Sequence, residues 1–521
     1  MPTSRSLWGL VSERAAETPD ALMMVDEHDR TMTFAQYKDA AERAAAGLAN
    51  QGLSAGDVVA WQLPTWIESA VLVAALSRLG VTQNPILPIY REHEVGFCTN
   101  QAGAKMLIVP STWNNIDFQA IGETVARKNS ARENSAGENG TGMSVLVADN
   151  VLPQGDPASL PPEPTEASAD EVRWLFYTSG TTADPKGAQH TDASIAAIGS
   201  AMGERLRCGP DSRNGMVFPF THIGGITWLF TSLQTQCANI FIEAFVPDLI
   251  LSTLGKNGVT HAGAGTIFHQ TYLAAQKAAD EPIFPDVTCF PGGGAPKPPQ
   301  LHFDLIEAFP QSSGVLSGYG LTEAPILTMC DFDMDDDALA TTEGYAMPGV
   351  DLKLVTVEGE PAAVGVEGEV RAKAPQLMKG YLDASLDAAG FDEDGYFRTG
   401  DLGRLDENGN LVITGRLKDV IIRKGENVSA KEVEDALYGN DKVGDVAVIG
   451  LPDERSGERV CAVVQTAEGQ DDLTMDEMVE FCKGTGMMMQ KVPEQLEIID
   501  AIPRNPAGKI LKHVLKEQYG G

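Results

Sequence analysis

Residues 173–187 read RWLFYTSGTTADPKG, an apolar run that leads directly into a loop of glycine, serine and threonine. The run 173–176 predicts a strand. The loop after it offers backbone N–H groups, several hydroxyls and the ammonium of Lys186, which are the donors that hold a phosphate chain. It lacks the Gly-Lys-Ser/Thr of a Walker A motif, so P-loop NTPase mechanics are not expected. The stretch predicts a phosphate-binding loop; for the loop taken alone, a flexible turn is the alternative.

The segments before this loop alternate between helical and strand-like patterns. Helical spacing and short apolar runs follow one another at residues 34–51, 58–63, 66–79 and 105–109. This alternation predicts an α/β fold with partly parallel sheets, here a large N-terminal domain of mixed sheets with flanking helices. The polar residues 127–142 and the proline-rich residues 153–170 predict surface loops.

A second boundary falls at residues 415–419, where a glycine and a charged cluster separate two strand-like runs. The residues that follow have an α/β pattern of their own, which predicts a small separate domain on a short hinge. Ser429 and Glu432 are spaced as the capping box of a helix. We therefore expect an N-terminal domain of residues 1–416 and a C-terminal domain of residues 417–521.

The chain has 521 residues, of which 43% are hydrophobic and 21% are charged. This is typical of a globular protein of about three or four domains or subdomains. No apolar stretch approaches the roughly 20 residues that a membrane-spanning helix needs, and residues 1–14 lack the apolar core of a secretory signal. The cytoplasm is therefore the expected location. The seven cysteines are scattered and form no Cys-x-x-Cys pair, which disfavours disulfides and zinc sites.

The 39 lysine and arginine residues are outnumbered by 73 aspartate and glutamate residues, so the formal net charge is −34. Such a field repels nucleic acids and anionic membranes, and a DNA-binding function is disfavoured. The charge is otherwise typical of solubility or of salt adaptation. If the ligands are polyanions, the cations that bind them must be few, local and assisted by a metal ion.

Further motifs follow the phosphate loop in a fixed order. They are FPFTHIGG (218–225), GGGAP (292–296), GYGLTE (318–323), YFRTGD (396–401), GRLKD with GEN (415–419 and 425–427) and PRNPAGK (503–509). Together with the loop, this series resembles the adenylate-forming superfamily of acyl-CoA synthetases, peptide-synthetase adenylation domains and beetle luciferases. The resemblance covers essentially the whole chain. Residues 84–92 and 423–427 look most like bacterial medium-chain or cyclohexanecarboxylate-type acyl-CoA ligases.

The resemblance implies a nucleotide site to which several of these segments contribute. The residues implied in binding ATP and AMP are Thr178, Ser179, Gly180, Thr181, Thr182, Lys186, Gly293, Gly294, Ala295, Pro296, Gly318, Tyr319, Gly320, Asp401 and Arg416. Ala183 stands where the family usually has glycine. This restricts the backbone at that point but leaves the phosphate donors in place.

Three residues are implied in catalysis. Thr322 would contact the α-phosphate, Glu323 would bind Mg²⁺, and Lys509 would bridge the attacking carboxylate and the phosphate. The implied acyl pocket, in which the histidine binds substrate and does no acid–base work, consists of His222, Ile223, Gly224, Ala264 and Ala324. The implied CoA tunnel and the hinge of a mobile C-terminal domain involve Gly425, Glu426 and Asp419.

Each of these residues taken singly has a simpler interpretation. A Thr-Glu pair such as Thr322 and Glu323 is commonly a solvated loop, and Asp401 after a glycine is commonly a turn or cap. His222 lies between apolar residues, as a core histidine does, and a C-terminal lysine such as Lys509 is usually a solvated charge. Their places in the ordered series favour the functional interpretation.

The function that the resemblance implies is ligation of a hydrophobic carboxylic acid to coenzyme A. ATP and the acid would form acyl-AMP and pyrophosphate, and CoA would then displace AMP, with Mg²⁺ as the metal. The partners would be these small molecules and no nucleic acid; a homodimer is compatible with the sequence. An acyl-AMP ligase that loads a separate carrier protein, a non-catalytic binding module and a luciferase-like oxidation remain alternatives. The acid stays open among medium-chain, alicyclic, aromatic and steroid-derived acids.

Overall fold

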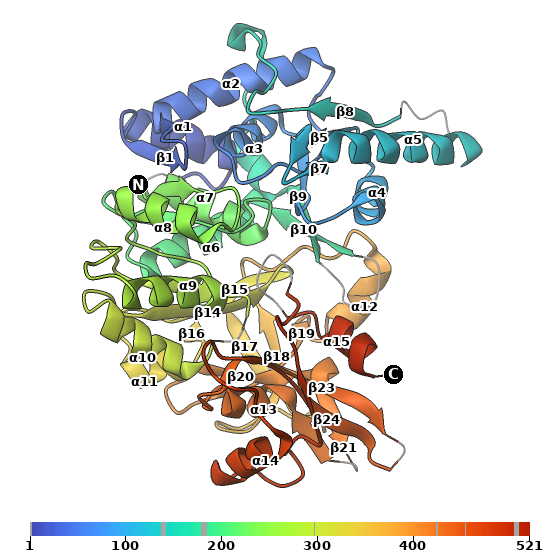
Figure 1. The fold of residues 1–521 in the computed structure, drawn as a ribbon. Coiled ribbons are helices and arrows are strands. Elements are labelled where there is room, and N and C mark those ends of the chain that lie inside the picture. The colour runs from blue at the N-terminus through green and yellow to red at the C-terminus, as the bar shows by residue number, and fades with distance from the viewer. Residues whose placement is uncertain are drawn as a thin grey trace.

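The computed structural model describes residues 3–136, 142–178, 185–295, 297–423, 426–453, 455–504 and 510–520. Within these residues the chain forms five larger sheets and one two-stranded ribbon, and one sheet joins strands from before and after the six-stranded sheet. Figure 1 shows the first third of the chain at one end of the molecule and the last hundred residues at the other. The prediction of an α/β fold is confirmed.

A six-stranded sheet in the order β10-β9-β4-β3-β5-β8 carries the start of the candidate site. Its strands are β3 (Val58–Trp61), β4 (Thr82–Pro85), β5 (Met106–Val109), β8 (Ser144–Val147), β9 (Val172–Thr178) and β10 (Lys186–Thr191). All neighbours are parallel except β9 and β10, which form an antiparallel pair. The central strands are short apolar runs because both faces of the sheet are buried.

Helices cover both faces of this sheet, and alternate strand residues enter two different cores. One core joins Val59 and Ile108 to α2 (Phe34–Asn50) and α3 (Ile67–Leu79). The other joins Ala60 to α4 (Glu92–Gln101) and α5 (Phe118–Ala136). The helices and strands expected from the alternating pattern are therefore confirmed within one to two residues.

The expectation of a surface loop over residues 127–142 is wrong for its first part, because α5 continues to Ala136. The composition is polar, but one side of the helix is anchored. Val125 lies in the core beside α4, and the buried Asn129 donates a hydrogen bond to Thr99 Oγ1 (3.2 Å). Buried contacts on one face thus override the loop-like composition.

Two four-stranded sheets lie beyond this layer. The first, in the order β11-β12-β1-β2, contains β1 (Leu22–Asp26), β2 (Thr31–Thr33), β11 (Arg213–Met216) and β12 (Ala238–Phe241). The second, in the order β13-β14-β15-β16, contains β13 (Phe290–Gly293), β14 (Val315–Leu321), β15 (Ala324–Met329) and β16 (Tyr345–Ala346). The helices of this region are α1 (Leu7–Glu17), α6 (Asp192–Arg205), α7 (Ile223–Thr235), α8 (Pro247–Lys256), α9 (Thr266–Lys277), α10 (Pro299–Ala308) and α11 (Asp336–Thr341). The ribbon consists of β6 (Thr112–Trp113) and β7 (Ile116–Asp117).

An antiparallel sheet in the order β17-β18-β19-β20 follows. It contains β17 (Asp351–Val355), β18 (Gly368–Lys373), β19 (Phe397–Leu405) and β20 (Leu411–Arg416), with the short helix α12 (Asp387–Gly390) between β18 and β19 in sequence. Its buried residues share one core with Tyr319 and Ala324 of the preceding sheet. This shared core fixes the position of β19 and β20 relative to β14 and β15.

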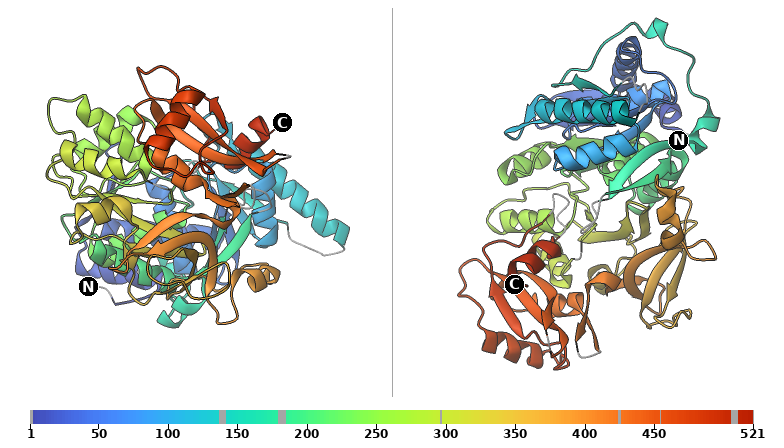
Figure 2. Two further views of the ribbon diagram at one scale, coloured as in Figure 1. Left: turned by 90° about the horizontal axis from the view of Figure 1, so that it is seen from below. Right: turned by 90° about the vertical axis from the view of Figure 1, so that its right-hand side faces the viewer.

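The last sheet has the order β22-β21-β24-β23, with β25 paired to β24. Its elements are β21 (Val420–Arg423), β22 (Glu426–Ser429), α13 (Ala430–Leu437), β23 (Val443–Asp453), β24 (Gly457–Thr466), α14 (Met475–Gly484), β25 (Gln495–Ile498) and α15 (Lys512–Tyr519). Alternate residues of β23 enter a core with α13 and α14 or a core with α15. Both views of Figure 2 show this part beside the rest of the protein. These separate cores agree with an independent C-terminal unit; the boundary after residue 416 stays a prediction.

The predicted capping box at α13 is only half formed. Ser429 Oγ accepts a hydrogen bond from Glu432 N–H (3.3 Å), as a helix N-cap does. The Glu432 carboxylate binds the Lys491 ammonium (2.7 Å) and does not return to the cap. Ser429 Oγ also donates to the Thr414 carbonyl (2.6 Å) of β20.

No helix in the described stretches combines the length and the apolar character needed to cross a bilayer.

Candidate nucleotide-binding and catalytic site

Several segments that are distant in sequence meet where β9 ends. β10 begins at Lys186, which lies opposite Thr178, the last residue of β9. Residues 378–382 run along β10 and bind it through backbone hydrogen bonds of 2.7 to 3.1 Å. The same segment holds the turn between β14 and β15, because Met378 N–H donates to the Glu323 carbonyl (2.9 Å). The strand that follows the predicted phosphate loop and the predicted catalytic turn are therefore held by the same segment.

Glu323 is the centre of this arrangement. It forms the two-residue turn between β14 and β15 together with Thr322 and is 9% exposed. Its Oε1 accepts a hydrogen bond from the Tyr381 hydroxyl (2.9 Å). Burial raises the pKa of the Glu323 carboxyl, and the Tyr381 hydrogen bond and the nearby Lys186 ammonium oppose that rise. The Lys186 ammonium lies 5.4 Å from the centre of the Tyr381 ring. A buried carboxylate, a phenol and a lysine thus converge at the turn.

Asp401 forms the second cluster. It lies within β19, in register with Arg416 of β20, so the interpretation as a turn or cap is wrong. Its Oδ1 is 2.8 Å from Arg416 Nε, and its Oδ2 accepts from the Tyr319 hydroxyl (2.8 Å). Burial, and next the Asp401 charge, raise the pKa of Tyr319. Asp401 therefore contacts both Tyr319 and Arg416, and all three residues belong to the set predicted to bind ATP and AMP.

The glycine motifs let strands approach closely. Gly293 at the end of β13 is in register with Gly318 of β14, and a Cβ at Gly293 would lie 2.6 Å from the Gly318 carbonyl oxygen. A Cβ at Gly320 would lie 2.2 Å from the backbone nitrogen of Ile326. Gly294 and Ala295 follow β13 directly, and Gly294 is exposed. Close packing alone requires glycine at 293 and 320, so the role of these residues in binding ATP and AMP stays a prediction.

The predicted acyl-pocket residues lie at the starts of α7, α9 and β15. His222 is the N-cap of α7, and its Nδ1 accepts from Gly224 N–H (3.1 Å). Burial lowers the pKa of His222 to about 4, so the ring is neutral at physiological pH. Ile223 and Ala324 are buried, and Ala264 precedes α9. A neutral, half-buried imidazole agrees with a binding role for His222 and not with acid–base work.

Several predicted site residues lie outside the described part of the chain. They are Ser179, Gly180, Thr181 and Thr182, together with Ala183, and Pro296, Gly425 and Lys509. Glu426 is the first residue of β22, and Asp419 ends a short 3₁₀ turn between β20 and β21. The assignments of the tunnel, the hinge and the catalytic lysine therefore remain predictions.

Three residues of this region were missed from the sequence. Tyr381 links Lys186 to Glu323, and the buried His190 binds the Thr322 carbonyl through Nε2 (2.8 Å). Lys418 lies two residues after Arg416. Burial lowers the pKa of Lys418 most, and the charge of Arg416 lowers it further. Lys418 was within reach of the sequence, because it belongs to the GRLKD motif. His190 follows Lys186 at strand spacing, whereas nothing local marks Tyr381.

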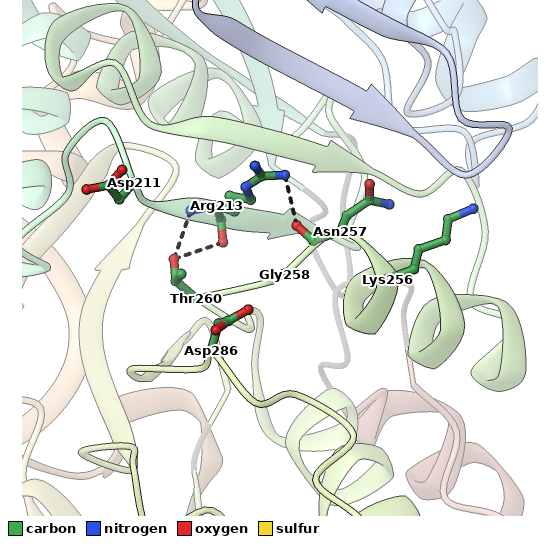
Figure 3. A pocket seen from close by; sticks show the side chains of 7 residues that line it. All are labelled: Asp211, Arg213, Lys256, Asn257, Gly258, Thr260 and Asp286. Carbon is green, nitrogen blue, oxygen red and sulfur yellow. Dashed lines mark hydrogen bonds between the residues drawn. The ribbon is translucent and has the colours of Figure 1, made fainter.

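A cavity of about 500 Å³ lies elsewhere in the protein (Figure 3). Its lining is polar, apart from one glycine, and consists of Asp211, Arg213, Lys256, Asn257, Gly258, Thr260 and Asp286. The Arg213 guanidinium donates to the Asn257 carbonyl (3.1 Å), and Lys256 binds Asp29 (2.5 Å). No residue of the candidate site lines this cavity, so it has no part in the chemistry considered below.

Parallel strands that end beside a lysine, a buried carboxylate and a carboxylate–arginine pair have the make-up of a nucleotide-binding α/β enzyme. Known families bear this out. Residues 11–382 match the family described as AMP-binding enzyme, and residues 432–509 match the AMP-binding enzyme C-terminal domain. The chain belongs to the AMP-binding enzyme family, which confirms the resemblance to adenylate-forming enzymes.

Relatives of known activity match over nearly the full chain. The medium-chain fatty-acid–CoA ligase of Escherichia coli K12 is 30% identical over 98% of this chain and 91% of its own length. The long-chain-fatty-acid–CoA ligase FadD13 of Mycobacterium tuberculosis is 32% identical over 99% of both chains. The salicyl-AMP ligase/salicyl-S-ArCP synthetase of M. tuberculosis is 28% identical over 99% of this chain and 91% of its own length.

Two solved structures of one relative, with and without ATP, can be compared with this chain. MatB from Rhodopseudomonas palustris is 27% identical, and each of its two structures covers 99% of both chains. The TM-score is 0.85 for its ATP-bound structure and 0.77 for its apo structure. The arrangement of this chain is thus more similar to the ATP-bound form of that relative.

Proposed function

We propose that this protein is an ATP-dependent acyl-CoA ligase that activates a hydrophobic carboxylic acid as acyl-AMP, releases pyrophosphate and transfers the acyl group to CoA. A carboxylate at neutral pH is a poor electrophile, and AMP turns one of its oxygens into a good leaving group. The observation that carries the proposal is the convergence of Lys186, Tyr381 and Glu323 at one turn. Family membership and the CoA-ligase relatives support it.

The first half-reaction needs cations around a polyphosphate. Lys186 supplies an ammonium at the edge of the phosphate loop, and Glu323 supplies a carboxylate whose ionised form burial disfavours. Within the described ranges no group of three or more His, Cys, Asp or Glu side chains is arranged to hold a metal by itself. One carboxylate combined with phosphate oxygens is the usual setting for Mg²⁺, which would neutralise charge on the phosphates. Glu323 therefore fits the role of a magnesium ligand that acts only with ATP.

The nucleoside half of ATP would be held by the Asp401 cluster. A carboxylate has acceptor sites for more than two hydrogen bonds, so Asp401 can accept from ribose hydroxyls while Arg416 and Tyr319 hold it in place. Only 4% of Asp401 is exposed to solvent, and its Oδ1 lies 2.8 Å from Arg416 Nε, so protein groups and not water hold its carboxylate. The ring of Tyr319 would then lie beside the adenine.

The second half-reaction rests on the resemblance alone. Lys509 would act only in the first half-reaction, when the acid attacks the α-phosphorus. Rotation of the C-terminal unit about Asp419 would then bring the region of Gly425 and Glu426 to the site and open a path for the CoA thiol. Two different requirements at one site explain why a small unit on a short connection follows the larger one.

The substrate is proposed to be a hydrophobic acid. His222 is neutral, Ile223 and Ala324 are buried and apolar, and none of the five predicted pocket residues is cationic. Transfer to a carrier protein in place of CoA is the second candidate, because one relative is named as a salicyl-AMP ligase and salicyl-S-ArCP synthetase. The acceptor distinguishes the two proposals.

A panel of carboxylic acids assayed for AMP formation with ATP and Mg²⁺, with and without CoA, tests the proposal. AMP release that depends on both CoA and an apolar acid is the expected result. Acyl-AMP that accumulates and is not consumed by CoA would support the carrier-loading alternative. No ATP turnover with any acid would refute both.

A further inference from the structure

We propose that His190 is a positioning residue for adenylation: its imidazole fixes the Thr322 carbonyl and so holds the turn that presents Thr322 and Glu323 to ATP. This inference rests on the adenylation activity proposed above. It adds a residue that lies outside every motif identified in the sequence.

The strand β10 places His190 beside the turn. Residues 186, 188 and 190 lie on the same face of the strand because side chains alternate between faces. Lys186 borders the phosphate loop, Ala188 forms a β-bridge with Tyr381, and His190 Nε2 lies 2.8 Å from the Thr322 carbonyl oxygen. One face of the strand therefore carries the phosphate lysine and the anchor of the catalytic turn, and the backbone of residues 187 and 189 binds the segment that contains Tyr381.

The hydrogen bond has a defined direction. A carbonyl oxygen can only accept, so Nε2 of His190 carries the proton and donates. Nδ1 faces Ser194 Oγ at 3.5 Å, and that hydroxyl donates to the Thr191 carbonyl (2.8 Å). His190 is fully buried, and burial lowers its pKa to about 4, so the neutral Nε2–H form persists at physiological pH.

The turn is held from two sides. It contains only two residues, and each of their carbonyls is bound by a different segment: Thr322 O by His190 and Glu323 O by Met378 N–H. The Glu323 side chain is held in turn by the Tyr381 hydroxyl. If the first of these bonds is lost, the peptide after Thr322 is free to tilt. A displacement of even 1 Å at a group that contacts the reacting phosphate lowers the rate strongly.

The competing interpretation is that His190 only fills the core, since its ring packs edge-on against Phe176 at 6.0 Å. The two roles predict different results for His190→Leu and His190→Gln. Leucine fills the space without a donor, whereas the glutamine amide can donate to the Thr322 carbonyl. A core role predicts that both variants lose stability and neither loses a specific step.

His302 offers a matched control. Its side chain is also fully buried, and it binds a backbone group, because its Nδ1 accepts from Val315 N–H (3.1 Å). Val315 begins β14, whereas the catalytic turn follows the other end of that strand. His302→Leu should therefore lower stability without a specific effect on adenylation.

Acid-dependent exchange of pyrophosphate into ATP, measured against Mg²⁺ concentration below the melting temperature of every variant, separates these roles. We expect His190→Leu to lower kcat by about tenfold or more and to raise the half-saturating Mg²⁺ concentration. His190→Gln should stay within about threefold of the wild type, with the KM for the acid unchanged in both. Should the leucine variant fail to fold, His190→Met takes its place.

Equal kcat and Mg²⁺ dependence in the wild type and His190→Leu would overturn the inference, as would equal losses in the leucine and glutamine variants. A kcat loss in His302→Leu as large as that in His190→Leu would also overturn it, because the effect would then follow from lost stability. A wild-type protein that catalyses no exchange with any acid would refute the proposed function itself.

Discussion

Replacing Tyr381 by phenylalanine removes one oxygen atom and the hydrogen bond that it donates to Glu323 Oε1 (2.9 Å). Glu323 is 9% exposed, so water replaces this donor poorly. Leaving a buried carboxyl without such a partner lowers stability by about 1 to 3 kcal/mol. The free energy of unfolding of the ligand-free protein should fall by about that amount, as measured by urea denaturation at neutral pH.

The same change should alter the pH dependence of adenylation. The Tyr381 hydrogen bond favours the ionised carboxylate and lowers the pKa of Glu323, against the larger effect of burial, which raises it. Without the hydroxyl the pKa of Glu323 rises further. If only the ionised form binds Mg²⁺, the acidic limb of kcat/KM for Mg·ATP moves to higher pH in Tyr381→Phe, and the two enzymes converge at alkaline pH.

Tyr396→Phe is the control for this experiment. Its hydroxyl also donates to a carboxylate, Asp351 Oδ2 (2.6 Å), but this bond is exposed. Both the unfolding energy and the pH profile should therefore stay near the wild type. Superimposable pH profiles for the wild type and Tyr381→Phe, or equal shifts in both variants, would refute the reasoning about Glu323.

Further predictions concern metal, reaction steps, substrate and stability. Glu323→Gln should lower Mg²⁺-dependent adenylation by more than about tenfold in the exchange assay, and full activity would remove Glu323 from the site. Lys509→Ala should abolish adenylation, but this variant should still convert supplied acyl-AMP and CoA to thioester. A bulky residue at Gly425 should spare adenylation and obstruct thioester formation. Equal losses of both steps in the two variants would contradict domain rotation. Medium-sized apolar acids should surpass acetate in kcat/KM, because each buried CH₂ contributes about 0.8 kcal/mol; a preference for acetate would contradict the pocket. Burial raises the pKa of Asp192 to about 6 from its ordinary 3.8, so the native state holds the carboxyl proton more tightly than the unfolded state does. The free energy of unfolding should therefore fall as the pH rises from 3.8 to about 6. Asp192→Asn should abolish that part of the slope in urea denaturation across pH, and an unchanged slope would exclude Asp192 as its source.

The sequence was a good guide wherever one local pattern sufficed. Apolar runs such as 58–63 and 105–109 became central strands because burial on both faces requires little besides apolar residues. The ordered motifs indicated the family, and the structure places Asp401 in contact with both Tyr319 and Arg416, as their shared assignment to ATP and AMP binding suggested.

The sequence failed where a contact between distant segments decides the outcome. Residues 127–136 look like a loop, but the bond from Asn129 to Thr99 holds them as a helix. Glu432 has the spacing of a capping box, but Lys491, almost sixty residues later, takes its carboxylate. Tyr381 and His190 act on the Thr322–Glu323 turn from other strands and loops. Nothing local marks Tyr381, and the strand spacing of His190 from Lys186 does not reveal that it contacts this turn.

The two-sided core of the last sheet has a consequence for the energy of reorientation. Because Val446, Val448, Ala447 and Ile449 are all covered within the C-terminal unit, the proposed rotation of that unit would expose none of them. One contact that would break is the bond from Ser429 Oγ to the Thr414 carbonyl, and a neutral hydrogen bond of this kind contributes only about 1 kcal/mol. If the remaining contacts between the two units are equally weak, the proposed rotation would leave alternative orientations populated at thermal energies. In the proposed rotation, the binding energy of ATP or of CoA would select between orientations without first unfolding any part of the protein.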